Sequence, residues 1–432
     1  MRRLAVTALP TGHAPVLGIW LATSILASYV GFMVGSTGSV ELIAAVTVLL
    51  CGLTAAAIVH HAAQYAAAFN VLLVVLLPEV LGRAVPSQLI VMLLAAHVGV
   101  LVVAGIHGPL QREDFGLLVL LAAVLWPYAI GGPLGTLPGA LGVVVLTYAT
   151  GRSGALTLQS FVALLLVAGA IHGAVAIAQS VPPLSGLVPF QPMRDGVPFL
   201  SGRATGLFNN PNTLGTLEAV ILVVAIRVGI PRWTVPLVVL CAAGLILSSS
   251  REAVFGLLVG LSLFGIHRFR QMAAWLILFV IVGGLSIWAF PTLLDRLDPT
   301  GYATDPNLVG RVEAWGAALD LVGRSPLLGF GTDVLNAVAF VDNAYVGWML
   351  AGGVAGLCLW ILGSVVVTPR LLWPVLAAML AIATLANPFS GPTYGVFLMA
   401  CGAVTAGNIR QRLLVPADGR SRGASQRTVA AT

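Results

Sequence analysis

Three arginines have the residue type and the surroundings to bind an anion: Arg203, Arg251 and Arg311. All 21 lysine-or-arginine positions of the chain are arginine, and these three lie beside long apolar runs within short motif-like stretches. A guanidinium group is planar, and its N–H donors form a fork that fits two oxygens of one phosphate. The three positions therefore predict a site for an anionic group, and a lipid-linked diphosphate is the natural candidate.

The stretch that follows Arg203 predicts the start of a helix close to it. Asn210 suits the N-cap position, Pro211 suits the first helical position, and an apolar helix continues from Asn212. The backbone N–H groups and the positive dipole end of such a helix favour phosphate oxygens. We therefore expect Arg203 and Asn212 to bind the diphosphate. The alternative is a simple capped turn with Arg203 in solvent.

Arg251 and Arg311 also allow structural alternatives. Arg251 follows three serines and precedes Glu252, which could orient it or offset its charge; the alternative is an arginine that snorkels at the membrane boundary. Arg311 precedes an apolar stripe at spacings of three, four and three residues, which predicts a short amphipathic helix on the bundle or at the membrane interface. The alternative is an exposed charge. The stripe consists of Val312, Trp315, Leu319 and Val322.

Asp342 and Asn343 stand directly before an apolar segment. Asp342 is a candidate base, and the alternative is that it only caps the following helix. The seven histidines lie away from the polar segment 291–342 and show no metal-binding spacing. We therefore expect neither a metal site nor a cofactor.

The composition indicates which elements must position these residues. Of the 432 residues, 59% are hydrophobic and 8% are charged, which is more apolar surface than a soluble core can use. Apolar runs recur at lengths near the roughly 20 residues that cross a bilayer, so we predict an all-α, polytopic integral membrane protein with about 12 to 14 transmembrane helices. The candidate segments are 16–34, 40–59, 62–81, 88–106, 116–131, 133–150, 156–180, 212–228, 233–250, 253–267, 271–290, 343–367, 371–387 and 393–409.

The distribution of arginines predicts the orientation. With the N-terminus inside, fourteen arginines face the cytoplasm and seven face outward, in agreement with the positive-inside rule. This orientation places two long segments, 181–211 and 291–342, outside, and both termini in the cytoplasm. The predicted organisation is an N-terminal bundle at 1–180, a region with the two outer loops at 181–409, and a basic, disordered tail at 410–432. The arginines form no continuous basic stripe, so nucleic acid is not an expected partner.

Four stretches make the chain resemble the O-antigen ligase and polymerase family. The resemblance implies a many-helix membrane fold with a large outer loop, and transfer of glycans from undecaprenyl-diphosphate carriers at the outer face of the bacterial plasma membrane. It also implies that neither a nucleotide sugar nor a metal is required, and that Arg203, Arg251 and Arg311 bind the diphosphate. The stretches are Arg203–Asn212, Ser249–Arg251, Gly310–Gly331, and Asp342–Tyr345 with Gly352–Gly356, in the family's order.

The chain departs from the family at the last motif. The family usually has a histidine before the asparagine, and that histidine is a candidate base for the acceptor hydroxyl; here the position is Asp342. A carboxylate can also activate an acceptor, and Asp333 and Glu313 are possible substitutes. The predicted catalytic residues are Asp342, Arg311 and Arg203. The predicted diphosphate-binding residues are Arg203, Arg251, Arg311, Asn212 and Asn343.

The leading hypothesis from the sequence is a membrane glycosyltransferase of the bacterial plasma membrane. Its partners would be a polyprenyl-diphosphate-linked glycan donor, a glycan or lipid acceptor, and the lipid bilayer. Polymerase and ligase activities both remain open. One alternative is a secondary transporter, for which Glu79, Glu218 and Glu252 are proton-coupling candidates. The other is an inactive relative that binds the lipid carrier.

Overall fold

The computed structural model describes a little over half of the chain, and every structural statement below refers to that part. The described residues are 62–76, 110–132, 137–181, 193–194, 197–198, 203–208, 210–229, 232–263, 277, 280–284, 306–337, 343–387 and 391–414. The candidate segments 16–34, 40–59 and 88–106 lie outside it, as does most of 271–290.

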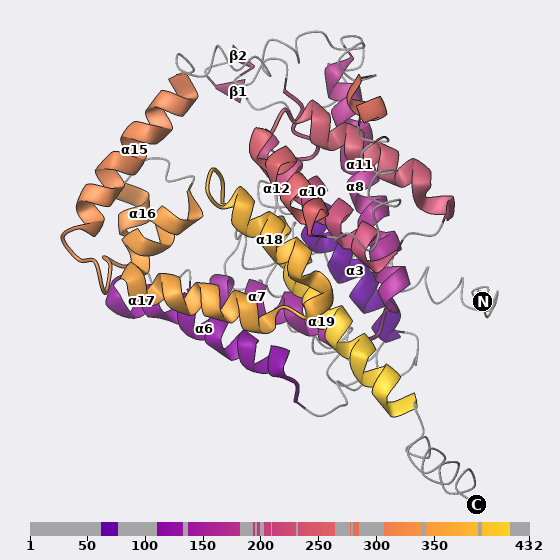
Figure 1. The fold of residues 1–432 in the computed structure, drawn as a ribbon, viewed down its shortest axis with the longest axis horizontal. Helices are drawn as coiled ribbons and strands as arrows, with labels where there is room; N and C mark the ends of the chain where they lie inside the picture. Colours follow the sequence, from indigo (N-terminus) through magenta and orange to yellow (C-terminus); the bar gives the residue numbers. More distant parts are fainter. Residues whose placement is uncertain are drawn as a thin grey trace, which may run out of the picture.

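Helices make up almost all of the described secondary structure, which confirms the predicted all-α class (Figure 1). The two strands, β1 (Met193–Arg194) and β2 (Val197–Pro198), form a short antiparallel hairpin. The longer helices are α3 (Ala62–Leu76), α6 (Arg112–Ile130), α7 (Leu137–Arg152), α8 (Leu158–Ser180), α10 (Pro211–Val228), α11 (Val235–Leu247), α12 (Arg251–Ser262), α15 (Pro306–Val322), α17 (Ala344–Val367), α18 (Trp373–Ile382) and α19 (Gly391–Leu414). The short ones are η2 (Arg232–Thr234), α16 (Val334–Ala337) and η5 (Arg370–Leu372).

Four of the described helices are long and apolar enough to cross a membrane: α6, α8, α10 and α17. The helices α11 and η5–α18 are apolar but shorter. The chain is therefore a multi-pass membrane protein. Most helix ends lie within a few residues of the predicted ones, because glycine, proline and polar caps interrupt the apolar runs. One boundary was wrong: α19 continues to Leu414, past the predicted start of the tail at residue 410.

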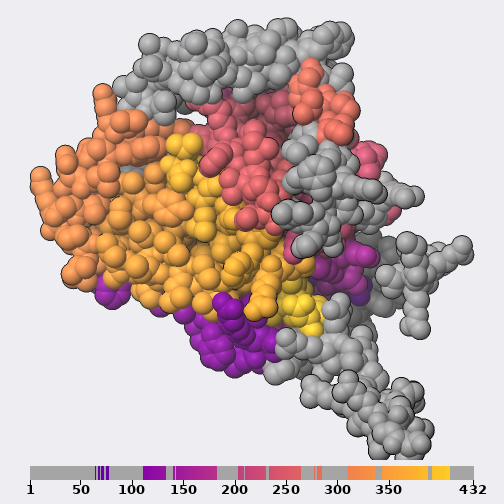
Figure 2. Space-filling model, viewed as in Figure 1, coloured from indigo at the N-terminus to yellow at the C-terminus, as the bar shows by residue number. Residues whose placement is uncertain are grey.

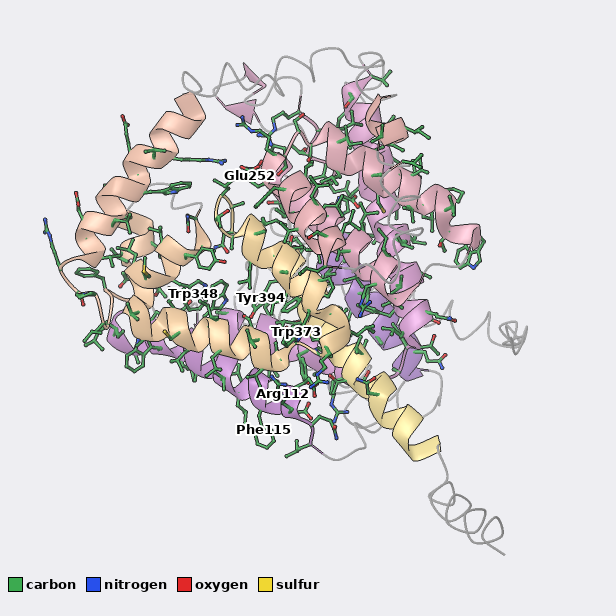
Figure 3. The ribbon with its side chains drawn as sticks, viewed as in Figure 1. Arg112, Phe115, Glu252, Trp348, Trp373 and Tyr394 are labelled. Carbon is green, nitrogen blue, oxygen red and sulfur yellow. The ribbon has the colours of Figure 1, made fainter. Side chains whose placement is uncertain are left out.

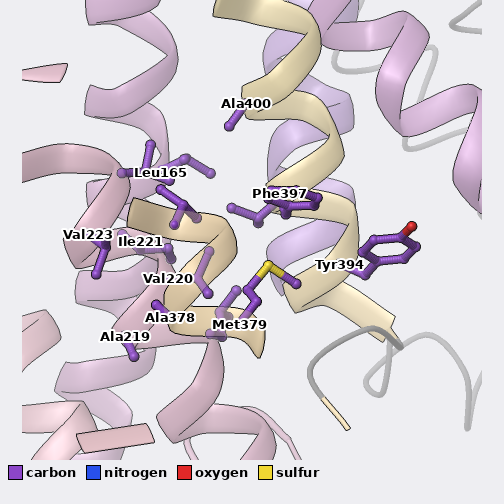
Figure 4. Close-up of a cluster of buried hydrophobic side chains, with 14 of the residues drawn as sticks. Leu165, Ala219, Val220, Ile221, Val223, Ala378, Met379, Tyr394, Phe397 and Ala400 are labelled. Carbon is purple, nitrogen blue, oxygen red and sulfur yellow. The ribbon is translucent and has the colours of Figure 1, made fainter. Parts of the chain in front are cut away.

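The core of the bundle is built around α10. Every residue from Leu214 to Ala225 is buried, because α8, α11, α12, α18 and α19 all pack against this helix. Figure 4 shows the cluster where α10 meets α8, α18 and α19, with Val220, Ile221, Met379 and Phe397 among its side chains. Burial on all sides fixes the position of the α10 N-terminus, which carries Asn210 and Asn212.

Small residues allow two further helix pairs to pack closely, α6 with α17 and α7 with α19. A Cβ atom added at Gly116 would collide with the backbone of Val367, and one added at Gly151 would collide with the backbone of Met399. Close backbone approach at glycine is typical of membrane helices, since lipid provides little hydrophobic drive for helix association.

A kink in α17 is filled by the segment that follows α15. Gly353 has φ 63° inside the helix, a conformation that glycine adopts without strain. The backbone N–H groups of Val354 and Ala355 donate to the carbonyls of Pro326 and Leu327. In return, the Leu350 and Ala351 carbonyls accept from the N–H groups of residues 330 and 331. Segment 326–331 therefore supplies the hydrogen bonds that the kink removes from α17.

The helix α15 lies against α17, so of the two placements predicted for the amphipathic helix, on the bundle or at the membrane interface, the structure shows the first. Figure 2 shows residues 306–337 and the following helices as one continuous surface. The buried face differs from the predicted stripe: Ala318 and Val322 pack against Val346 and Leu350, whereas Val312 and Leu319 are 56% and 47% exposed. The small Ala318 side chain permits the close approach. Arg311 lies seven residues before Ala318, so it shares this bundle-facing side.

Candidate anion-binding site

The turn between α11 and α12 is the centre of the candidate site. We call Ser248, Ser249 and Ser250 the serine turn. Ser249 has φ 50°, the one positive φ at a non-glycine residue in the described part of the chain, and such a conformation costs about 1 kcal/mol or more. The turn is held by the Ser248 hydroxyl, which accepts from the Ser250 N–H (3.2 Å). Ser250 is the N-cap of α12. The backbone carbonyls of Ser248 and Ser249 are thereby turned toward Arg203.

Arg203 is half-buried and binds directly to this turn. Its Nε donates to the Ser248 carbonyl oxygen at 2.9 Å, and its Nη2 contacts the Ser249 carbonyl oxygen at 3.4 Å. Nη2 also donates to the Asn212 Oδ1 at 2.6 Å. The alternative of a solvated Arg203 is therefore wrong, whereas binding of the diphosphate by Arg203 and Asn212 stays a prediction.

The start of α10 is as the sequence predicts. Asn210 is the N-cap, its side-chain oxygen accepts from the Asn212 N–H at 2.8 Å, and Pro211 occupies the first helical turn. Because Asn212 also accepts from Arg203, the guanidinium group is held at the positive end of the α10 dipole. Two sources of positive potential therefore coincide at this point.

Two residues that the sequence analysis missed position the segment carrying Arg203. The Gln179 side-chain oxygen accepts from the N–H groups of Thr205 (2.9 Å) and Gly206 (3.0 Å), and its Nε2 donates to the Gly206 carbonyl (2.9 Å). His172 accepts from the Leu207 N–H at 3.3 Å and stacks on Phe208. Both residues belong to α8. A polar residue near the end of an otherwise apolar helix was the signal that could have identified Gln179.

Arg311 reaches the same turn from α15. Its Nη1 forms an ion pair with the Glu252 Oε1 at 2.7 Å and contacts the Leu385 carbonyl oxygen at 3.4 Å. The two side chains are only 19% and 8% exposed, so the alternative of a solvated Arg311 is wrong. The sequence suggests that Glu252 is a partner of Arg251. In the structure Glu252 pairs instead with Arg311, which lies 59 residues after Glu252 in the chain. Figure 3 shows Glu252 at the end of α12 that faces α15.

Arg251 is the first residue of α12, between Ser250 and Glu252, and it is partly buried. The Glu252 Oε2 accepts from the Ser250 hydroxyl at 3.1 Å, and the charges of Arg311 and Arg203 both act on this carboxylate. The structure therefore brings the side chains of Arg203 and Arg311 to the N-terminal end of α12, whose first residue is Arg251. We call these three arginines, together with Glu252, the arginine cluster.

Two polar atoms near the cluster are buried without a hydrogen-bond partner within the described residues. They are the Ser249 hydroxyl and the Trp315 Nε1. Ser249 belongs to the serine turn, and Trp315 follows Arg311 by one helical turn on α15. A buried donor without a partner is costly, and an oxygen-rich ligand at the cluster would remove that cost.

Asn343 joins the site through the segment that follows α18. It is the N-cap of α17, and its Nδ2 donates to the Thr384 carbonyl oxygen at 2.8 Å. The next residue of that segment is Leu385, whose carbonyl contacts Arg311. The alternative role of Asp342 as the cap is wrong, because Asn343 has that role. Asp342 itself lies outside the described residues.

The substitute bases considered in the sequence analysis have different positions. Glu313 and Asp333 both have exposed side chains. Glu313 lies on α15 two residues after Arg311, and Asp333 directly precedes α16. Both residues therefore stay candidates for the general base.

A largely apolar cavity of about 500 Å³ lies within the helix bundle. It lies between α6, α7, α17 and α19, and Trp348 and Tyr394, which line it, are labelled in Figure 3. Ala344 and Asn387 line its edge. Ala344 follows Asn343, and Asn387 lies two residues after Leu385. Segment 384–387 therefore connects the charged cluster to the edge of the cavity, an arrangement suited to a ligand with an anionic head and an apolar body.

The comparisons with known proteins agree with the resemblance seen in the sequence. Residues 236–361 match the family model described as O-antigen ligase. The match covers less than a third of the 432 residues and includes the serine turn, Arg251, Arg311 and most of α17. No curated protein and no solved structure matches the chain significantly. The chain is thus a multi-pass membrane protein that carries, at residues 236–361, a domain of the O-antigen ligase and polymerase family.

Proposed function

We propose that the protein is a glycosyltransferase that moves a saccharide from a polyprenyl-diphosphate carrier to a glycan or lipid acceptor. The reaction takes place at the outer face of the bacterial plasma membrane, with both termini of the chain in the cytoplasm. The observation that carries the proposal is the convergence of Arg203 and Arg311 on the serine turn and Glu252, from segments more than one hundred residues apart.

The arginine cluster binds the diphosphate of the donor. Departure of the diphosphate places negative charge on the oxygen that was bonded to the sugar, and positioned guanidinium groups stabilise that charge. Arg203 is held at the α10 N-terminus, and Arg311 is held by Glu252, so both are positioned before the donor arrives. Fixed donors reorganise little during the reaction, which is the main source of electrostatic catalysis.

A carboxylate near the acceptor accepts the proton of the attacking hydroxyl. Asp342 is the proposed base because it directly precedes Asn343, which is linked to Arg311 through segment 383–385. Glu313 and Asp333 are the alternatives for this role. A general base contributes about 100-fold or more to such a reaction.

The neighbouring cavity supports a lipid-linked substrate. Its walls are mainly aliphatic and aromatic, so they suit a hydrocarbon or the apolar face of a sugar ring. A soluble nucleotide sugar would gain little from such a surface. The combination favours a donor whose anionic group lies at the membrane boundary.

Full-length protein reconstituted in liposomes, with a radiolabelled polyprenyl-diphosphate glycan and an acceptor, tests the function. A larger labelled glycan or a labelled acceptor lipid supports a transferase. Uptake of intact label into the vesicle lumen would instead indicate a transporter, and retention without turnover would indicate a lipid-carrier-binding protein. Arg324→Ala is the matched control for substitutions in the cluster, because Arg324 is an exposed arginine just after α15.

A further inference from the structure

We propose that Glu252 competes with phosphate for Arg311 and thereby promotes release of the spent polyprenyl diphosphate. The inference rests on the proposed function, and it assigns Glu252 a role as a positioning residue that acts through Arg311. It concerns the step after transfer, when the site must exchange one lipid diphosphate for another.

Glu252 is an anion that already lies within the cluster. Its Oε1 is 2.7 Å from the Arg311 Nη1, and its Oε2 accepts from the Ser250 hydroxyl. The carboxylate is only 8% exposed, and the charge of Arg203 also acts on it. A phosphate that binds both Arg203 and Arg311 must therefore share Arg311 with Glu252 or displace it.

The charge of the substrate increases during the proposed reaction. Transfer breaks the bond between the anomeric carbon and a diphosphate oxygen, and it forms a bond from that carbon to the acceptor oxygen. The bonding electron pair stays on the diphosphate, and the acceptor proton passes to the base. The donor diphosphate is a diester with two negative charges, whereas the product has a terminal phosphate whose second pKa is about 6. At neutral pH the product is therefore more negative than the donor.

An arginine cluster without a carboxylate would consequently hold the product more tightly than the donor. Coulomb attraction to several guanidinium groups grows with each added charge, and it is strong in a partly buried site. Glu252 lowers the positive charge of the cluster by one, which weakens the attraction for the more negative product more than the attraction for the diester. Glu252 also provides Arg311 with a partner as the product leaves, so no unpaired buried charge is created.

Binding measurements on the full-length protein in detergent test this competition without depending on turnover. The probes are farnesyl diphosphate, which resembles the product, and its methyl diester, which resembles the donor. We expect Glu252→Gln to tighten farnesyl diphosphate by about tenfold and the diester by clearly less. Glu252→Ala should act in the same direction and provides a second variant if the first does not fold.

The controls separate lost competition from a general change in charge or structure. Glu252→Asp keeps the carboxylate and should bind farnesyl diphosphate nearly as the wild type does. Asp320→Asn removes one negative charge from an exposed position of α15, nine residues after Arg311 and therefore on the opposite face of the helix; it should change nothing. In Glu252→Gln combined with Arg311→Ala, the gain in affinity should disappear.

Kinetics provide the second readout. If transfer is active, Glu252→Gln should slow steady-state turnover more than it slows the first turnover, because product release is affected more strongly than transfer. Unchanged or weaker binding of farnesyl diphosphate to Glu252→Gln and Glu252→Ala overturns the inference. If the Glu252 variants bind farnesyl diphosphate more tightly but the wild-type protein transfers no glycan, the proposed function is overturned. The competition between Glu252 and phosphate for Arg311 would still hold.

Discussion

Two buried ion pairs of this membrane protein differ in how fully their carboxylates are occupied. Asp114 accepts from Arg152 through both Nε (3.0 Å) and Nη2 (3.2 Å), from the Tyr148 hydroxyl (2.9 Å) and from the Gln111 N–H (2.8 Å). Glu252 accepts from the Arg311 Nη1, the Ser250 hydroxyl and its own backbone N–H. The first pair joins the consecutive helices α6 and α7, whereas the second joins α12 to α15. A bidentate, fully bonded carboxylate indicates a structural clamp, and a less occupied one can exchange its arginine for a ligand.

The comparison teaches that burial of an arginine in a membrane protein is not by itself a sign of function. Arg152 and Arg311 are both largely buried against a carboxylate. Arg311 lies beside a strained turn that also binds Arg203, whereas Arg152 joins α7 to α6. We therefore expect Arg311 to be required for activity and Arg152 to be required for stability.

The largest expected effect comes from removing an arginine of the cluster. Arg311→Ala and Arg203→Ala should each lower the transfer rate by about 100- to 1000-fold, because each removes a positioned donor to the leaving diphosphate. Initial rates with labelled donor in liposomes measure the effect, and Arg324→Ala should keep the wild-type rate. Wild-type activity in Arg311→Ala would place the functional cation elsewhere.

Loss of the proposed base should have the next largest effect. Asp342→Asn should lower transfer by about 100-fold and leave the thermal midpoint unchanged, since Asn343 caps α17. Asp342→His should retain measurable transfer at neutral pH, because imidazole is a better base there. If Asp342→Asn is fully active, the same assay on Glu313→Gln and Asp333→Asn identifies the base.

The other ion pair should respond in stability rather than in catalysis. Arg152→Ala leaves Asp114 buried without its cation, which should lower the free energy of unfolding by about 3 kcal/mol. Denaturant unfolding in detergent measures this loss. The specific activity of the folded fraction should stay close to that of the wild type. If Arg152→Ala lost transfer activity but kept normal stability, Arg152 would also have a functional role.

The smallest expected effect comes from changing Gln179, which holds the segment that carries Arg203. Gln179→Ala removes the side chain that bonds to the backbone of Thr205 and Gly206, so the segment carrying Arg203 should become less ordered. We expect donor affinity to fall several-fold and the rate at saturating donor to change little, since the cluster itself is intact. Separate measurement of KM and kcat tests this expectation, with a raised KM and a nearly unchanged kcat as the expected result. Gln64→Ala, at an exposed glutamine of α3, is the matched control.

Local sequence patterns were sufficient for most of the described fold. Apolar runs ended by glycine, proline and polar residues predict α8, α10 and α17 nearly to their observed ends, because each helix must fill the same bilayer thickness. The cap at Asn210 and Pro211 was also predictable, since capping depends on only a few neighbouring residues. The three arginines could be selected from their motif-like surroundings and their predicted side of the membrane.

Long-range pairing was not predictable. The contact between Arg311 and Glu252 depends on how α15 lies against the bundle, and a short helix with several apolar positions can present more than one face. The large residues of α15 suggested a stripe that includes Val312 and Leu319, whereas the small Ala318 determined the packing. The roles of Gln179 and His172 likewise arise only when α8 and segment 203–208 come together.

The loop that fills the α17 kink restricts how a substrate can approach. If segment 326–331 lifted away, two amide groups and two carbonyls of an apolar helix would lose their partners, at a cost of several kcal/mol per group away from water. We therefore expect this loop to remain packed against α17 and not to act as a lid. In the proposed reaction, the isoprenoid tail of the donor would then enter laterally between helices, and the sugar head would arrive along a path that leaves these hydrogen bonds intact.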